Sequence, residues 1–205
     1  MQVFESLDIA EQFANPILTI GNYDGLHVGH KKIIDRVREK ALAINGTAVL
    51  MTFDPHPLRV IRPDKVVGMV TPVYLKKKLI EEAGIDVLFD LPFNDEFRLI
   101  TPEEFVRRIL VETLAIKGLI VGYDFKFGRQ GKGTIDDLRT LSGRYGYSFE
   151  VQSPITLDGE KVGSNRIRKM IAEGEVEKAG RHLGRPYMIE GLVVPGEARG
   201  RSIGF

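Results

Sequence analysis

A regular alternation of short apolar runs with longer amphipathic segments constrains this chain more than any other feature. The short runs, which we expect to be strands, cover residues 17–20, 47–53, 87–91, 119–121 and 148–151. The amphipathic segments, which we expect to be helices, cover residues 31–44, 75–83, 102–113, 135–145 and 166–173, the last two capped by Thr134 and Ser164. Strands that alternate with helices of these lengths predict an α/β fold with an open, mostly parallel sheet.

Composition excludes several classes of protein. The 29 Lys and Arg residues nearly balance the 28 Asp and Glu residues, which argues against nucleic-acid or membrane-surface partners. The chain contains no cysteine, so a disulfide scaffold, a thiol nucleophile and a thiolate zinc site are excluded. No apolar run approaches 18 residues, and the N-terminal segment contains Glu5 and Asp8 instead of a basic leader. We therefore expect a soluble protein of the cytoplasm.

The pattern changes near the C-terminus. Residues 188–194 resemble a strand, and residues 195–205 are rich in glycine and arginine. About twenty residues are too few to bury a core. We therefore expect one domain over residues 1–184 and the opening fragment of a second, β-type domain over residues 185–205.

Three loops that follow strands carry unusual chemistry. They are residues 21–30, 54–57 and 122–128, and they contain three of the four histidines. In open parallel sheets, ligands bind beyond the carboxyl ends of the strands, where the strand order reverses. We therefore expect the three loops to meet at one site. The segments Lys76–Lys77–Lys78 and Arg107–Arg108 are interpreted instead as solvated helix faces.

The first loop favours phosphate binding. Its glycines permit tight turns and a close approach of backbone N–H groups to phosphate, and His27 and His30 stand three apart at the start of a helix. Two other interpretations stay open at this point, a glycine-rich turn with solvent-exposed histidines and a zinc site made by His27, His30 and His56. The spacing fits neither a Rossmann fingerprint nor a P-loop.

Two further segments support a ligand site. Ser164 at a helix start, with Arg168 one turn on, could bind an anion, although a plain helix cap and a solvated arginine are the alternatives. Pro55 and Pro57 stiffen the second loop, which suits a pocket for a flat ring. Alternation around Lys126 predicts that only one of its two flanking phenylalanines faces the core.

Taken in order, the motifs resemble a known family. His27-Val28-Gly29-His30 matches the H-x-G-H motif of the nucleotidylyltransferase superfamily, which has a Rossmann-like sheet. The longer G-N-Y-D-G-L-H-V-G-H, followed by F-D-P-H-P at residues 53–57 and G-Y-D-F-K-F-G at residues 122–128, resembles bacterial FAD synthetase. The resemblance is to the FMN adenylyltransferase module of the bifunctional riboflavin kinase/FAD synthetase family, and it covers residues 17–184.

The resemblance implies roles for particular residues. It implies a catalytic group made of His27, His30, Ser164 and Arg168. It implies that ATP contacts these four and also Gly21, Asn22, Tyr23, Asp24, Gly25 and Asn165. It implies a flavin pocket made of Pro55, Pro57, Phe105, Asp124 and Phe127. Gly163 and Asn165 depart from the Ser-Ser-Thr segment typical of the family, and Lys161 stands where an arginine is common.

The implied reaction converts FMN and ATP to FAD and pyrophosphate with Mg²⁺. No carboxylate cluster suggests a magnesium cage, so we expect phosphates and water to hold the metal. The alternatives are a sibling nucleotidylyltransferase with another phosphorylated acceptor, and a nucleotide- or flavin-binding module without turnover. Residues 191–205 resemble the opening of the family's riboflavin kinase module, without the Pro-Thr-Ala-Asn residues that follow it there. We therefore expect FMN adenylylation but no phosphorylation of riboflavin.

Overall fold

The computed structural model describes residues 1–9, 12–64, 68–194, 196, 199 and 204. The strands are β1 (Gln2–Phe4), β2 (Ile17–Ile20), β3 (Ala48–Phe53), β4 (Val87–Leu91), β5 (Gly118–Gly122), β6 (Ser148–Gln152), β7 (Thr156–Leu157) and β8 (Glu160–Lys161). The α-helices are α1 (Val28–Ala43), α2 (Pro57–Ile61), α3 (Val73–Glu82), α4 (Asp95–Leu99), α5 (Pro102–Glu104), α6 (Ile135–Tyr145), α7 (Ser164–Ala172) and α8 (Val176–Leu183). A π-helix, η1 (Phe105–Thr113), continues α5, and a 3₁₀ turn, η2 (Arg129–Gly131), precedes α6.

The predicted α/β fold with an open parallel sheet is confirmed. Six parallel strands form the sheet in the order β1-β4-β3-β2-β5-β6, and β7 and β8 form a small antiparallel hairpin. The chain runs outward from β2 through β3 to β4, and then crosses to β5 and β6 on the other side of β2. The strand order therefore reverses between β2 and β5, which is where open sheets of this kind bind ligands.

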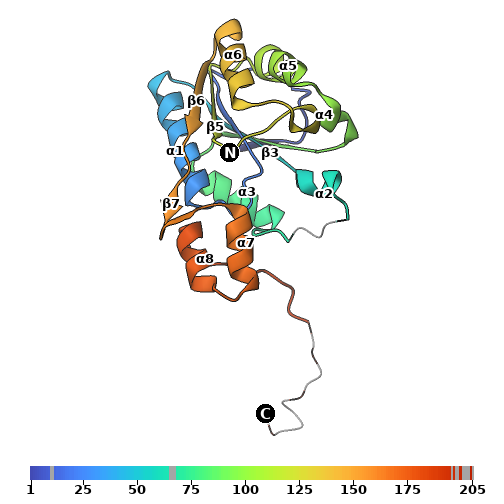
Figure 1. Cartoon of the computed structure of the whole chain (residues 1–205), viewed down its shortest axis with the longest axis vertical. Coiled ribbons are helices and arrows are strands. Elements are labelled where there is room, and N and C mark those ends of the chain that lie inside the picture. The colour runs from blue at the N-terminus through green and yellow to red at the C-terminus, as the bar shows by residue number, and fades with distance from the viewer. Residues whose placement is uncertain (10–11, 65–67, 195, 197–198, 200–203, 205) are drawn as a thin grey trace.

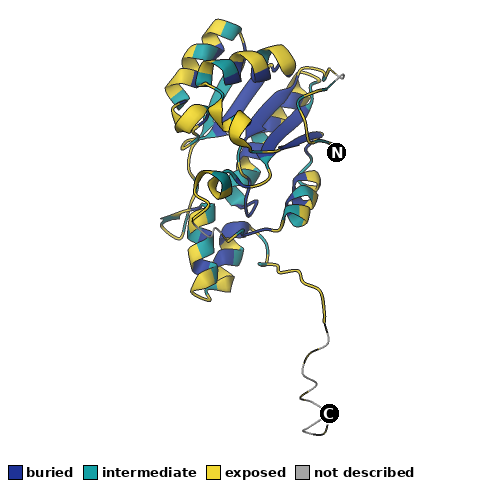
Figure 2. Ribbon diagram, turned by 90° about the vertical axis from the view of Figure 1, so that its right-hand side faces the viewer, coloured by how far each residue is buried: buried dark blue, intermediate teal, exposed yellow. Residues whose placement is uncertain are grey.

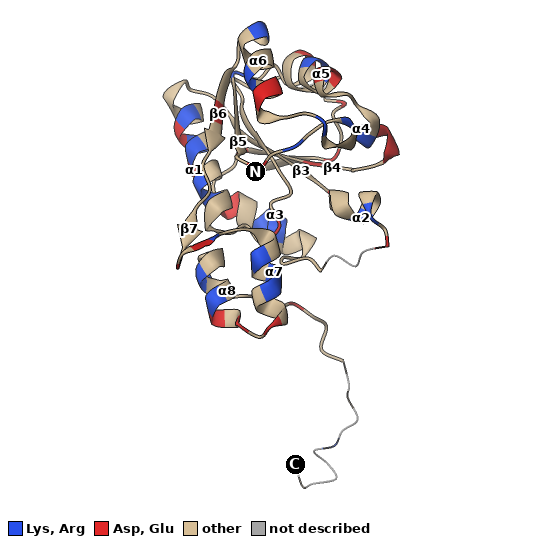
Figure 3. Ribbon diagram, viewed as in Figure 1, with Lys and Arg blue, Asp and Glu red and all other residues tan. Residues whose placement is uncertain are grey.

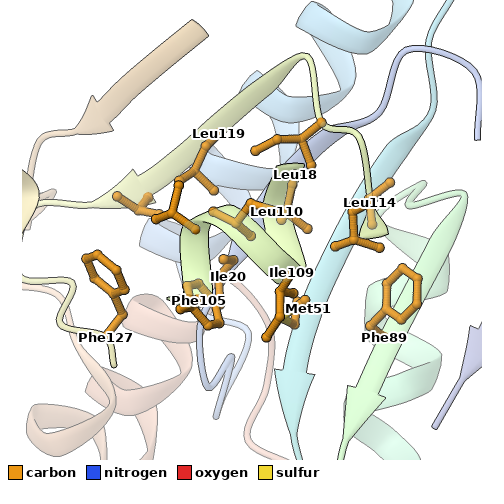
Figure 4. Close-up of a cluster of buried hydrophobic side chains, with 14 of the residues drawn as sticks. Leu18, Ile20, Met51, Phe89, Phe105, Ile109, Leu110, Leu114, Leu119 and Phe127 are labelled. Atoms are coloured by element: carbon orange, nitrogen blue, oxygen red, sulfur yellow. The ribbon is translucent and has the colours of Figure 1, made fainter. Parts of the chain in front are cut away.

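Helices cover both faces of the sheet (Figures 1 and 2). Successive buried residues of the strands belong in turn to the two core clusters on these faces. On one face, η1 and α6 pack on Leu18, Met51, Phe89 and Leu119, as Figure 4 shows for the η1 side. On the other face, α1 and α3 pack on Leu50, Leu88 and their neighbours. Strands covered on both faces become almost continuously apolar, so short apolar runs were a reliable strand signal here.

Side chains cap the starts of α1, α2, α4, α5 and α6, whereas α3, α7 and α8 have no side-chain cap. Thr134 caps α6 in a reciprocal capping box with Asp137, as the sequence predicts. Ser164 does not cap α7, because the N-cap is Gly163 and no side chain bonds the first turn. The Ser164 hydroxyl instead donates a hydrogen bond of 2.8 Å to the Asp24 carbonyl. The expectation that Ser164 is a helix cap is therefore wrong, because its hydroxyl bonds the backbone carbonyl of Asp24 instead of the first turn of α7.

Other differences concern short or unpartnered segments. Sequence periodicity missed β1, α2, α4, α8 and the β7–β8 hairpin, most of which are too short to show a periodic pattern. The strand expected over residues 188–194 is also wrong, since these residues are irregular and largely exposed and lead away from the domain (Figure 1). A lone strand has no neighbour to satisfy its backbone groups. Most of the glycine- and arginine-rich segment 195–205 lies outside the described residues.

Candidate functional site

The three loops meet at one cleft, as predicted. The cleft has a volume of about 710 Å³ and lies beyond the carboxyl ends of β2, β3 and β5. Its lining residues fall within the segments 20–33, 53–61, 93–105, 122–131 and 152–168. The three loops, which lie far apart in the sequence, therefore share one ligand-sized space at the point where the strand order reverses.

The two histidines of the first loop form a stacked pair at the start of α1. Their rings lie 3.6 Å apart with an interplanar angle of 14°. His27 caps α1, because its Nδ1 accepts a 3.2 Å hydrogen bond from the backbone N–H of His30. A neutral His27 whose Nδ1 accepts a hydrogen bond carries its proton on Nε2. Nε2–H is therefore a defined donor at a helix N-terminus, where anions are stabilised.

Burial keeps both rings neutral. Loss of solvation lowers the pKa of His27 to about 4, and the nearby Asp24 carboxylate opposes this only in part. Burial lowers the pKa of His30 well below its ordinary value, and the neighbouring His27 ring lowers it further. The Nδ1 atom of His30 is buried without a hydrogen-bond partner. The pair therefore offers neutral hydrogen-bonding groups to an incoming anion, with one buried nitrogen left unsatisfied.

Asp24 lies behind the cleft, where its hydrogen bonds and its ion pair connect three segments of the chain. Its side chain is buried and accepts hydrogen bonds of 3.0 to 3.1 Å from the backbone N–H groups of Val70 and Thr71. It also forms a 2.7 Å ion pair with the guanidinium of Arg168, and its carbonyl accepts the Ser164 hydroxyl. These bonds connect the first loop, residues 70–71 and α7.

Arg168 is engaged by protein acceptors at all three nitrogens. Besides Asp24, it donates to the Gly68 carbonyl at 2.7 Å and to the Asn165 side chain at 2.5 Å. Contact between Arg168 and a departing pyrophosphate stays a prediction, and it would require the guanidinium to exchange one of these acceptors for phosphate. The local sequence around Arg168 could not show that the guanidinium pairs with Asp24, because Asp24 lies 144 residues away.

Most of the predicted site residues line the cleft. The predicted residues in its wall are Gly21, Asn22, Tyr23, His27, His30, Pro57, Phe105, Asp124, Phe127, Ser164, Asn165 and Arg168. Asp24, Gly25 and Pro55 are absent from its described lining, since Asp24 is bonded behind the loop and Gly25 packs against Val70 and Leu183. Tyr23 lies in the wall, but its hydroxyl is hydrogen-bonded to Thr19 at 2.6 Å and the side chain is buried.

One end of the cleft is aromatic. A chain of phenylalanine rings with neighbouring centroids 5.2 to 6.1 Å apart runs through Phe93, Phe53, Phe97, Phe105, Phe127 and Phe125. All six line the cleft. Phe127 is buried and Phe125 is half-buried, but both pack against the same core cluster with their rings stacked. The expectation that only one of them faces the core is therefore wrong, because the segment does not alternate its side chains as an extended strand would. This wall suits a flat apolar ring.

Sequence reasoning missed several lining groups. Leu58 and Ile61 of α2 line the cleft as exposed apolar side chains, but α2 is only five residues long and had no periodic signal. Lys126 and Lys161, which the sequence motifs include without an assigned contact, also line the cleft, and among the described residues neither has a carboxylate within ion-pair distance. Lys161 lies 5.4 Å over the Tyr123 ring. Basic residues also lie along α7 and α8 (Figure 3).

The described residues contain no group of three His, Cys, Asp or Glu side chains arranged to hold a metal ion. Because His27, His30 and His56 are all among these described residues and do not form such a group, the three-histidine zinc interpretation has no geometric support. Asp124 is the one carboxylate in the described lining of the cleft. Within the same described part of the chain, no helix is both long and apolar enough to cross a membrane.

Known proteins are similar to this chain over most of its length. A family model described as FAD synthetase matches residues 9–166. The chain is 35% identical over 199 residues to the bifunctional riboflavin kinase/FMN adenylyltransferase of Bacillus subtilis, covering 96% of this chain and 62% of that protein. It is 32% identical over 189 residues to the protein of the same description from Escherichia coli K12, covering 92% and 60%. The chain thus spans about three fifths of the length of these curated relatives.

Solved structures agree on the fold. A crystal structure titled as a macrolide-efflux protein from Streptococcus pneumoniae is similar with a TM-score of 0.85 and 26% identity, covering 98% of this chain and 66% of that one. Pantothenate synthetase from Thermus thermophilus aligns with a TM-score of 0.50 and 17% identity, covering 90% and 81%. At that identity the second likeness concerns the fold alone.

Proposed function

This chain belongs to the FAD synthetase family, and we propose that it transfers the adenylyl group of ATP to FMN, releasing FAD and pyrophosphate. The observation that carries the proposal is that the stacked histidines and the phenylalanine wall open into a single cleft. One end offers donors for a polyphosphate, and the other offers an apolar face for the isoalloxazine ring. A phosphate oxygen of FMN would attack the α-phosphorus of ATP while the bond to the β-phosphate breaks.

The protein's contribution would be positioning and stabilisation of charge. In this proposal, His27 Nε2–H and the first N–H groups of α1 receive the triphosphate. Lys126, Lys161 and the N-terminus of α7 stabilise the pyrophosphate as it leaves. Phe105 and Phe127, with Pro57, Leu58 and Ile61, bound the isoalloxazine ring. Asp124 lies at the junction of the two substrates.

We propose that ATP enters as its magnesium complex. The described residues supply no cage of acidic ligands for the metal, which is consistent with Mg²⁺ held mainly by phosphate oxygens and water. Mg²⁺ in that position would neutralise charge on the departing pyrophosphate. A cytoplasmic location stays a prediction.

The test incubates the protein with ATP, Mg²⁺ and one acceptor at a time, namely FMN, nicotinamide mononucleotide or phosphopantetheine. Release of pyrophosphate and formation of the adenylylated product are followed by chromatography. We expect FAD from FMN and no product from the other two. His30→Asn serves as a matched control for contaminating enzymes, because it replaces the ring at the phosphate end of the cleft. Product from another acceptor would favour the sibling enzyme, and tight FMN binding without pyrophosphate would favour a binding module.

A further inference from the structure

A buried lysine behind the cleft has no role in the mechanism above. Lys76 is the first of three consecutive lysines in α3, a run expected to face solvent. The expectation is wrong for Lys76, whose side chain is 3% exposed, whereas those of Lys77 and Lys78 are 30% and 56% exposed. A buried ammonium group needs a specific set of partners, since loss of hydration is strongly unfavourable.

Lys76 finds its partners at the carboxyl ends of two central strands. Its Nζ donates to the Thr52 hydroxyl at 3.3 Å and to the Phe53 carbonyl at 3.4 Å, both at the end of β3. Its counter-charge is Asp90 of β4, with Oδ1 3.7 Å away, and the other oxygen of Asp90 pairs with Lys77 at 2.9 Å. Two of the three ammonium protons thus have hydrogen-bond acceptors at the end of β3, and Asp90 supplies the counter-charge without a hydrogen bond from Lys76.

These contacts reach both ends of the cleft. The Thr52 hydroxyl, which accepts from Lys76, donates in turn to the backbone carbonyl of Asn22 at 3.2 Å. Asn22 belongs to the phosphate loop and lines the cleft, while Phe53 lines its aromatic end. Neither Lys76 nor Thr52 is among the described residues that line the cleft. One side chain therefore links the backbone at the phosphate end to the backbone at the aromatic end without access to a ligand.

Stability of the fold does not account for a lysine at this place. Replacing a buried ion pair by apolar side chains of similar volume is often neutral or stabilising. We propose that Lys76 is a positioning residue for adenylyl transfer, an inference that rests on the proposed function. Through Thr52, Lys76 would hold the backbone at Asn22 in a fixed position relative to the backbone at Phe53. In-line attack depends on the relative placement of the two substrates, and a shift of about 1 Å can lower a rate by about a hundredfold.

The test compares Thr52→Val, Lys76→Met and the double variant Lys76→Met with Asp90→Leu. Thr52→Val keeps the shape and removes only the hydroxyl between Lys76 and Asn22. Lys78→Met is the matched control, because Lys78 is exposed on the same helix. Within the described residues, its one ion pair is with the exposed Glu82. For each protein we would measure thermal unfolding, kcat, and KM for ATP and for FMN.

We expect kcat to fall roughly tenfold or more in Lys76→Met and roughly threefold or more in Thr52→Val, with little change in either KM. The double variant should regain thermal stability relative to Lys76→Met without regaining kcat, which a purely structural role would not produce. Lys78→Met should match the wild type.

Three results would overturn the inference. The first is a folded Lys76→Met protein with wild-type kcat and KM values. The second is recovery of kcat together with stability in the double variant. The third result applies if Lys76→Met does not fold, and it is a folded Thr52→Val protein with an unchanged kcat. A wild-type protein that makes no FAD would instead refute the proposed function, and this inference with it, before any variant is compared.

Discussion

Replacing Arg168 by methionine should lower the free energy of unfolding by about 3–5 kcal/mol, the range observed when one partner of a buried ion pair is removed. The Asp24 carboxylate is 1% exposed and Arg168 is 19% exposed, so the variant leaves a buried carboxylate without its counter-charge. The backbone N–H groups of Val70 and Thr71 would still bond the carboxylate, which places the expected loss nearer the lower end of that range.

For a chain of 205 residues, each kcal/mol corresponds to roughly 2–4 °C in Tm, so the expected fall is about 6–20 °C. Urea unfolding at pH 7 measures the loss directly. Arg144→Met is the matched control, because its ion pair with Glu103 is about 60% exposed on both sides and should contribute less than about 1 kcal/mol. If Arg168→Met loses no more stability than Arg144→Met but loses most of its kcat, Arg168 grips the substrate and the argument from Asp24 is refuted.

Three further predictions concern the cleft. His30→Ala should lower kcat by more than about tenfold with little change in FMN affinity, because it removes a group at the phosphate end, and wild-type turnover would contradict this. Pro57→Ala should weaken FMN binding more than ATP binding in fluorescence titrations, and equal losses would assign Pro57 to the fold alone. Stability should fall as the pH drops from about 6.5 to about 4, by up to about 1.4 kcal/mol per unit for His27. The reason is that burial lowers the pKa of native His27 to about 4, so the unfolded chain binds the proton first. Urea midpoints at several pH values should show a shallower slope in His27→Gln, and an unchanged slope would contradict the assignment.

Features determined by local sequence could be predicted. The central strands and the long helices follow from apolar periodicity, and the convergence of the three loops follows from the rule for parallel sheets. The H-x-G-H stretch indicated the histidine end of the cleft, for which phosphate binding stays a prediction, and the phenylalanines around Lys126 indicated the aromatic end. In each case the signal lies within about ten neighbouring residues.

Features determined by distant partners could not be predicted. Lys76 and Lys78 are the same residue type two positions apart, and only the strand ends beneath α3 distinguish the buried one from the exposed one. Asp24, which bonds both Arg168 and Ser164, likewise belongs to a loop at least 140 residues earlier. A helical pattern shows which face a residue occupies, but it does not show what lies opposite that face.

The place of β2 in the sheet has a consequence for synthesis on the ribosome. One edge of β2 pairs with β3, which follows closely, whereas the other pairs with β5, whose Gly118 aligns with Ile17. At about 5–20 residues per second, β5 is made roughly 5–20 s after β2. During that interval a growing chain holds an apolar strand with one unpaired edge, the kind of edge that recruits strands from other chains. Slow synthesis between β2 and β5 should therefore raise the fraction of nascent chains that require a chaperone.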